Sequence, residues 1–252
     1  MKLTKFTLTS IVLSALFVIL SFGGQSSTGT SVARPPSTTN SSNQLALNWT
    51  SNVDSASFQA ERVDFIDAAS SGDISYTLSG LGGSGQMKMG LRNKTERSWL
   101  VSIEVGTEFE PGENSVQRMV ATTKIEVHLH PHEQTTLEVE VNCLDISKLP
   151  PSQSNTSWTS RRSSKLAQFL RCANEKIDQA KRGTREAQLL EDARPLLIQF
   201  SLWSARGATR GEWIDFWVHY QHMPRQQAVE LVNAFAPALE EVTGSCQSLT
   251  SL

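Results

Sequence analysis

The sequence predicts an α+β protein in which an antiparallel β-sandwich of about seven strands precedes a unit of four helices. Three observations support this fold class. Apolar and polar residues alternate between positions 85 and 143, as expected for strands that bury one face. Residues that form turns interrupt the stretch about every ten residues. From Ser164 onward the apolar residues instead recur at helical spacing.

Residues 1–24 are expected to be a signal peptide or membrane anchor. Lys2 and Lys5 precede an apolar run from Ile11 to Phe22, which is the pattern of a secretory signal. The run is shorter than the roughly 20 apolar residues of a membrane-spanning helix. No A-x-A cleavage motif precedes Gly24, so an uncleaved tether through residues 6–24 is an alternative. Either way, the chain is expected to be secreted or extracytoplasmic.

A flexible linker is expected over residues 25–57. This segment is rich in Ser, Thr, Asn and Gly and contains Pro35 and Pro36. It offers few large apolar side chains to offset the entropy cost of ordering the chain.

The β-sandwich domain is predicted over residues 58–145. Residues 58–67 and 74–78 are the expected first strands. Three later strands follow from apolar residues at every second position: Trp99, Val101, Ile103 and Val105; Ile125, Val127 and Leu129; and Leu137, Val139 and Val141. The glycine-rich segment 80–85 lies between two strands and opens no helix, so we interpret it as a hairpin loop and not as a phosphate-binding loop.

This strand pattern resembles the immunoglobulin-like β-domains of secreted and surface proteins. The resemblance depends on the pattern of strands and turns. The Cys, Trp, Cys arrangement of immunoglobulin domains is absent, because no cysteine precedes Trp99.

A connection is predicted over residues 146–163, where Pro150 and Pro151 cannot donate to a strand ladder. The helical unit follows over residues 164–252. Its expected boundary signals are Gly183 after the first helix, Thr184 as a cap, Pro195 as a break or restart, Gly207 as a stop, the Thr209 and Glu212 capping box, and Pro224.

One helix carries an aromatic stripe of Trp213, Phe216, Trp217 and Tyr220. Trp and Tyr are enriched at binding hot spots. The spacing is also what any buried helix face requires, and we favour this core interpretation.

Three cysteines in an exported chain indicate one disulfide and one remaining thiol. Pairing of Cys143 with Cys172 would join the helical unit to the sandwich. Pairing of Cys172 with Cys246 would close the helical unit on itself. The sequence leaves both pairings open.

Two short segments also resemble the bacterial surface thioester domains. They are Asn142 to Asp145 at the end of the β-domain and Ile198 to Trp203 on a later helix. The resemblance implies that Cys143 supplies the thiol and Gln199 the acyl group of an internal thioester that captures amines. Leu144 and Ser201 depart from the family, which has an aromatic residue and an alanine at these positions.

His128 and His130 alternate along one strand and are the candidate metal ligands. The simpler interpretation is an exposed strand face with titratable side chains.

No nucleophile elbow, phosphate loop, zinc-protease or EF-hand motif is present, and no cofactor is expected. Residues 25–159 carry 9 basic and 15 acidic side chains, whereas residues 160–225 carry 12 and 7. The basic part has no nucleic-acid motif, so we interpret it as solvated helix faces. Four glycosylation motifs begin at Asn40, Asn48, Asn93 and Asn155.

The function expected from these features is non-catalytic interaction with an unidentified protein or cell-surface ligand, with no nucleic acid. The edges and loops of the sandwich, including Pro111 to Val116, are the expected contact surface. The alternatives are covalent adhesion through the Cys143 and Gln199 thioester, and metal binding through the two strand histidines.

Overall fold

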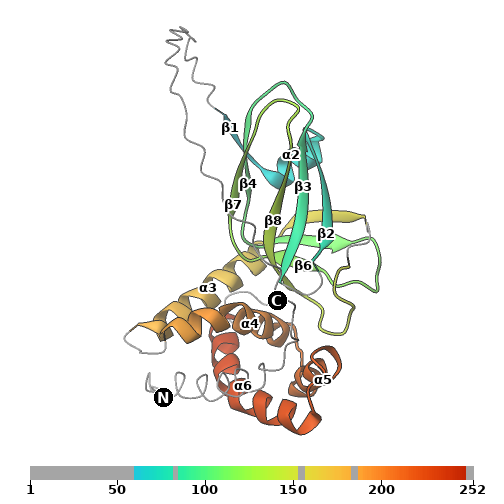
Figure 1. The fold of residues 1–252 in the computed structure, drawn as a ribbon. Coiled ribbons are helices and arrows are strands. Elements are labelled where there is room, and N and C mark those ends of the chain that lie inside the picture. The colour runs from blue at the N-terminus through green and yellow to red at the C-terminus, as the bar shows by residue number, and fades with distance from the viewer. Residues whose placement is uncertain (1–59, 82–84, 153–156, 183–186, 248–252) are drawn as a thin grey trace, which may run out of the picture.

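The computed structural model describes residues 60–81, 85–152, 157–182 and 187–247 (Figure 1). Within these ranges the protein is α+β, with nine strands in two sheets and five helices. The expected signal segment and the whole of the expected linker lie outside the described residues. Within the described ranges, no helix combines the length and apolar character needed to cross a membrane.

The smaller sheet has the order β1-β4-β7. Its strands are β1 (Glu61–Asp64), β4 (Trp99–Ile103) and β7 (Ile125–Leu129). β1 runs parallel to β4, and β7 runs antiparallel to it. The sheet confirms the predicted strand at 125–129, while β4 ends at Ile103, two residues before Val105.

The larger sheet has six antiparallel strands in the order β2-β3-β8-β6-β5-β9. Its strands are β2 (Ile74–Gly80), β3 (Gln86–Asn93), β8 (Gln134–Cys143), β6 (Met119–Ala121), β5 (Thr107–Pro111) and β9 (Trp158–Arg162). β2 and β3 form the hairpin expected around the glycine-rich segment. β8 continues the sheet from β3 to β6.

The prediction of one strand over residues 58–67 was wrong. β1 ends at Asp64, and a helix, α2 (Phe65–Ser71), follows at once. The Asp64 side chain caps this helix by accepting a hydrogen bond from the amide of Ile66 at 2.8 Å. Gly72 then ends it in the left-handed conformation, with φ of 83°. A local capping signal therefore overrides the apolar alternation.

β9 is a strand that the sequence did not reveal, since it lies in the segment interpreted as a connection. Trp158–Arg162 pairs antiparallel with β5. The argument from proline holds for Pro150 and Pro151, which are in no strand. It does not extend to Trp158, because a proline blocks a ladder only where its own amide would have to donate.

The two sheets and α2 share one hydrophobic core. Its fully buried members include Phe65 from α2, Val101 and Leu129 from the smaller sheet, and Met89 and Val139 from the larger sheet. Both sheets and α2 therefore bury apolar side chains in the same cluster.

Four longer helices follow the sheets in the chain and lie together at one end of them (Figure 1). They are α3 (Ser164–Lys181), α4 (Ala187–Ala205), α5 (Arg210–Tyr220) and α6 (Arg225–Gln247). The Thr209 and Glu212 capping box is confirmed. Gly207 follows α4 with φ of 89°, as a helix stop requires. Pro195 lies inside α4, so the expected break is absent. The predicted signals at Gly183 and Thr184 lie outside the described residues.

Phe200 of α4 lies at the centre of an aromatic cluster between α4, α5 and α6. Its ring contacts the rings of Trp203, Trp213, Phe216, Trp217 and Phe235. Trp213 and Trp217 are buried, which confirms the core interpretation for these two members of the stripe. The side chain of Tyr220 lies outside the described part of the chain.

Candidate functional site

A cavity of ≈ 670 Å³ lies between the ends of the strands of the larger sheet and the helices α4 and α5. This volume is within the range of about 300 to 1,000 Å³ typical of small-ligand sites. Its described lining comes from β2, β3, β6, β8, a proline-containing segment, α4 and α5: Gly80, Leu81, Gly85, Gln86, Met87, Gln117, Met119, Asn142, Cys143, Pro150, Pro151, Asp192, Pro195, Leu196, Gln199, Trp203, Phe216, Trp217 and Gln221.

Close backbone packing shapes one wall of the cavity. The amide of Gly80, at the end of β2, donates to the carbonyl of Ser152 at 3.0 Å. A Cβ atom at Gly80 would lie 2.2 Å from the carbonyl oxygen of Pro151. Only glycine therefore allows the segment with Pro150 and Pro151 to approach the sheet this closely.

The lining is apolar and rich in side-chain amides. Met87, Met119, Leu196 and the rings of α4 and α5 supply the apolar surface. Five carboxamides accompany them: Gln86, Gln117, Asn142, Gln199 and Gln221. Asp192 carries the one charge among the described lining residues, and it is exposed at the surface of α4. The cavity therefore offers hydrogen bonds without a cationic group.

Three lining residues carry buried polar atoms that lack a hydrogen-bond partner within the described part of the protein. They are Gln117 Oε1, Trp203 Nε1 and Trp217 Nε1. Leaving such an atom unpaired costs about 1 to 3 kcal/mol, and most buried polar groups in folded proteins are paired. Trp158 and Trp213, which are not among the described lining residues, carry buried indole nitrogens of the same kind, so these atoms do not distinguish the cavity from the rest of the core.

Cys143 and Gln199 meet at this cavity. Gln199 lies on α4, and its carboxamide pairs with both backbone polar groups of Cys143 at the end of β8. The Cys143 amide donates to Gln199 Oε1 at 2.7 Å, and Gln199 Nε2 donates to the Cys143 carbonyl at 2.6 Å. The structure thus brings together the two residues that the thioester resemblance singles out.

The thiol of Cys143 is partly buried and remains free. Burial, together with the negative charge of Asp145, raises its pKa to about 12. The thiol therefore stays protonated at neutral pH, which makes it a weak nucleophile.

A charged network next to Cys143 joins the sheet to α4. Arg118 binds Asp145 through two side-chain nitrogens, at 3.0 and 2.6 Å. Arg118 and Arg161 also bind the buried carboxylate of Glu108, and Arg206, which directly follows α4, approaches Asp145 at 3.6 Å. Burial would raise the pKa of Asp145, but the hydrogen bonds from Arg118 outweigh it and the pKa lies below its usual value.

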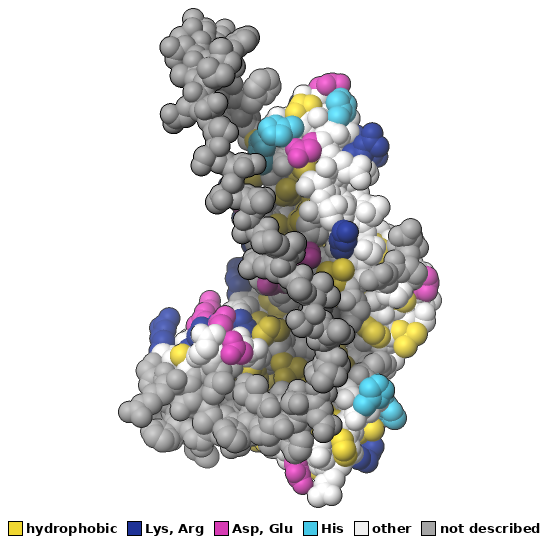
Figure 2. Space-filling model, viewed as in Figure 1, with side chains coloured by type: hydrophobic (Ala, Val, Ile, Leu, Met, Phe, Trp, Pro, Cys, Tyr) yellow, Lys and Arg dark blue, Asp and Glu magenta, His cyan; other side chains and the backbone are white. Residues whose placement is uncertain are grey.

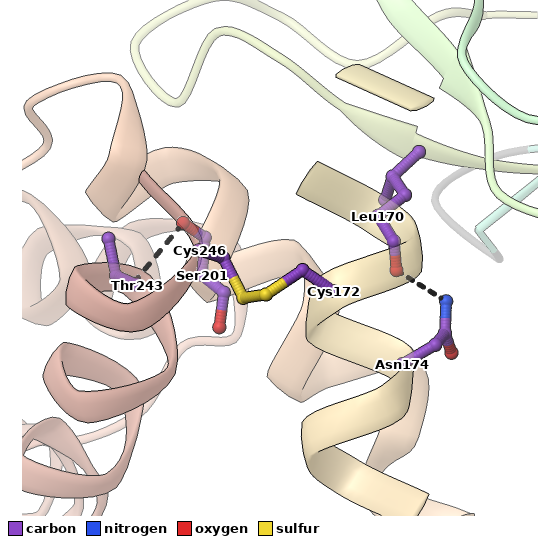
Figure 3. The surroundings of a disulfide bond; sticks show 6 residues. All are labelled: Leu170, Cys172, Asn174, Ser201, Thr243 and Cys246. Atoms are coloured by element: carbon purple, nitrogen blue, oxygen red, sulfur yellow. Dashed lines mark hydrogen bonds between the residues drawn. A yellow bond between two sulfur atoms is a disulfide. The ribbon is translucent and has the colours of Figure 1, made fainter. Parts of the chain in front are cut away.

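The disulfide joins Cys172 of α3 to Cys246 of α6 (Figure 3). It decides between the two pairings left open by the sequence, and it closes the helices on themselves across 74 positions. Near it, the hydroxyl of Thr243 donates to the carbonyl of Ser201 at 3.5 Å, which adds a contact between α6 and α4.

The histidine candidates lie away from this cavity. His128 and His130 are exposed, and their rings meet edge to face with centroids 4.6 Å apart. Figure 2 shows histidine side chains at the end of the sheets farthest from the helices and a second group beside the helices. In the described ranges, no group of three or more His, Cys, Asp or Glu side chains is arranged to hold a metal ion.

Sequence reasoning named Cys143 and Gln199, and it weighed the stripe with Phe216 and Trp217 as a binding surface before favouring a core role, but it did not connect these residues in one cavity. Gln117 and Trp203 are separated by more than 80 positions and belong to different layers, so no local pattern could connect them. Comparison of the chain with family models, with curated proteins and with solved structures gives no match.

Proposed function

We propose that the protein is an exported, non-catalytic binding module that holds a ligand in the cavity between the larger sheet and α4. One observation carries this proposal. The cavity is of ligand size, and its described lining combines apolar side chains with five carboxamides. The proposed ligand-binding surface is therefore the cavity, in place of the loops around Pro111 to Val116 that the sequence suggested.

In this proposal the two sheets form an immunoglobulin-like sandwich, and α3 to α6 form a helical unit that closes the cavity. Export follows from the expected signal segment at residues 1–24. The disulfide between Cys172 and Cys246 supports export, because such bonds persist in oxidising compartments. The raised pKa of the Cys143 thiol supports binding over catalysis at this cavity.

A cavity-filling variant tests the proposal. Leu196 lines the cavity from α4, so Leu196→Trp should occupy its volume. Leu149 is 58% exposed and is not among the lining residues, so Leu149→Trp is the matched control. The probe is Nile red, an uncharged apolar dye, with binding followed by its fluorescence.

We expect dye binding by the wild type and by Leu149→Trp, and at least about tenfold weaker binding by Leu196→Trp. Equal affinity of both variants, or no binding to the wild type, would contradict a ligand site in this cavity. Thermal unfolding of each variant, measured in parallel, separates loss of the site from loss of the fold.

A second candidate function is covalent adhesion through an internal thioester. It is favoured by the contact between the Gln199 carboxamide and Cys143. In this reaction the Cys143 sulfur attacks the Gln199 carbonyl carbon, the carbon–nitrogen bond breaks, and the nitrogen leaves as ammonia with the thiol proton. A target amine would later displace the sulfur and form an amide with Gln199.

Intact-mass spectrometry of the unreduced protein separates the two functions. The thioester requires a mass lower by one ammonia, and this difference must disappear in Cys143→Ala. If the mass is unmodified and Cys143 can be alkylated after unfolding, the thioester is excluded and the non-covalent binding module remains the proposed function. In that case the hydrogen-bonded pair is a structural contact between α4 and β8.

A further inference from the structure

We propose that the junction between the larger sheet and the end of α4 binds an oxyanion, a phosphate or sulfate group, with Arg206 as its main contact. The site is a group of positive side chains that outnumber the carboxylates between them. Its positive members are Arg118 before β6, Lys148 after β8, Arg161 on β9 and Arg206 directly after α4. None of them is among the described lining residues of the cavity, so this inference is independent of the proposed function.

Two of the four positive side chains are fully engaged by carboxylates. Arg118 donates to both oxygens of Asp145, from Nη2 to Oδ1 at 2.6 Å and from Nε to Oδ2 at 3.0 Å. Arg161 likewise donates to both oxygens of Glu108, at 2.8 and 2.9 Å. Paired, charge-assisted bonds of this kind fix the orientation of both partners. These two arginines therefore have little capacity left for a ligand.

Arg206 and Lys148 have no such pairing. Nη2 of Arg206 lies 3.6 Å from Asp145 Oδ1, which already accepts the bond from Arg118. Nζ of Lys148 lies 4.0 Å from Asp145 Oδ2. Both distances are too long for a hydrogen bond. Within the described residues, the guanidinium of Arg206 has this ion pair and no hydrogen bond, so its donors are available to another acceptor.

Positive charge exceeds negative charge in this group. The four positive side chains lie near the carboxylates of Glu108 and Asp145 and near the exposed carboxylate of Glu110. One positive charge therefore remains unbalanced. Burial, and then the nearby charge of Arg118, lower the pKa of Arg206. An anion bound to Arg206 would relieve this repulsion between guanidinium groups.

Solvent reaches the two cations that keep free donors. The side chains of Arg206 and Lys148 are 27% and 35% exposed, so an ion can bind them without an opening of the fold. They approach different oxygens of Asp145, so one anion that contacts both needs several oxygens. Phosphate and sulfate have them, and a guanidinium pairs with such groups through parallel hydrogen bonds. Because Asp145 remains in place and repels the anion, we expect binding in the millimolar range.

The test measures the urea midpoint of the full chain while sodium phosphate replaces sodium chloride at constant ionic strength, so that screening does not change. The proteins are the wild type, Arg206→Gln, Lys148→Gln and Arg210→Gln. Arg210→Gln is the matched control, because Arg210 pairs with Glu240 and has no contact with this group among the described residues. Phosphate also stabilises proteins by its exclusion from their surface, and this general effect is common to all four.

We expect phosphate to raise the midpoint of the wild type and of Arg210→Gln equally. From the concentration dependence of the midpoint, Arg206→Gln should bind phosphate at least roughly fivefold more weakly, with a smaller loss for Lys148→Gln. An equal rise in all four proteins would overturn the oxyanion site and leave the group as a structural network. Should Arg206→Gln not fold, the comparison of Lys148→Gln with Arg210→Gln decides.

A second measurement separates two sources of the phosphate group. The wild type and Arg206→Gln are sedimented with vesicles of phosphatidylcholine, with and without phosphatidylglycerol. Binding that requires phosphatidylglycerol and Arg206 would assign the group to a lipid headgroup, whereas phosphate binding without vesicle binding would assign it to a soluble ligand. Nile red binding should be unchanged in Arg206→Gln, so failure of this site and failure of the cavity are distinguishable.

Discussion

The side-chain amide of Gln199 bonds to the Cys143 backbone as a neighbouring strand would, with distances of 2.7 and 2.6 Å. This contact holds α4 against the end of β8, and it lies where the cavity meets the sheet. The same pair therefore bears on the stability of the fold, on the proposed ligand site and on the thioester alternative.

Replacement of Gln199 by Glu should destabilise the protein by about 1 to 3 kcal/mol at neutral pH. The carboxylate keeps an acceptor for the Cys143 amide but loses the donor to its carbonyl. Urea unfolding measures the change, with Gln226→Glu as the exposed control. A loss for Gln199→Glu no greater than for the control would show that the pair contributes little to stability.

Loss of the disulfide should lower the stability by about 4 kcal/mol, because a loop of 74 positions is no longer closed in the unfolded chain. The variant is Cys172→Ala combined with Cys246→Ala, and its denaturant midpoint is compared with that of the wild type. Cys143→Ala, which leaves the bond intact, is the control. If a reductant lowers the wild-type midpoint but does not affect the double variant, the effect belongs to this bond.

Asn93 should be a structural residue and not a sugar site. Its side chain is fully buried and donates to the carbonyls of Arg97 and His130, at 2.7 and 2.8 Å. Its Oδ1 accepts from the amide and hydroxyl of Thr95. We expect Asn93→Ala to lose about 3 kcal/mol, measured by thermal unfolding, whereas the exposed Asn114→Ala changes little. Recovery of a glycan on folded Asn93 would contradict this placement.

The raised pKa of Cys143 predicts a loss of stability at alkaline pH. In the unfolded chain the thiol loses its proton near its ordinary pKa of 9.0, and in the folded state only near 12. Because the unfolded state releases its proton first, this contribution is complete below pH 9 and is lost as the pH rises toward 12. Urea unfolding between pH 7 and pH 10.5 should show a steeper decline for the wild type than for Cys143→Ala. Parallel declines would mean that the thiol is not desolvated.

The sequence predicted those parts of the fold that have local signals. Alternation placed the strands around Val127 and Val139, and the Thr209 and Glu212 spacing placed the start of α5. α2 was missed because alternation continues through Phe65, and the cap at Asp64 outweighs it. β9 was missed because its pairing with β5 is a long-range choice that the residues around Trp158 do not encode.

The candidate site was accessible to sequence reasoning only in part. The resemblance to thioester domains named Cys143 and Gln199, and the structure places them in contact. The surrounding cavity depends on how the helices dock on the strand ends. Only that docking brings Gln117 and Trp217 to one cavity, so no spacing in the chain could predict it.

β9 is the edge strand of the larger sheet next to β5. Without it, β5 would present an unpaired edge, and such edges promote aggregation by pairing with other chains. β9 covers this edge and replaces it with a strand of five residues. During synthesis, which starts at the N-terminus, the edge of β5 stays unpaired until the chain has been made as far as residue 162. A fragment that ends at residue 145 should therefore aggregate, whereas one that ends at residue 162 has its edge covered.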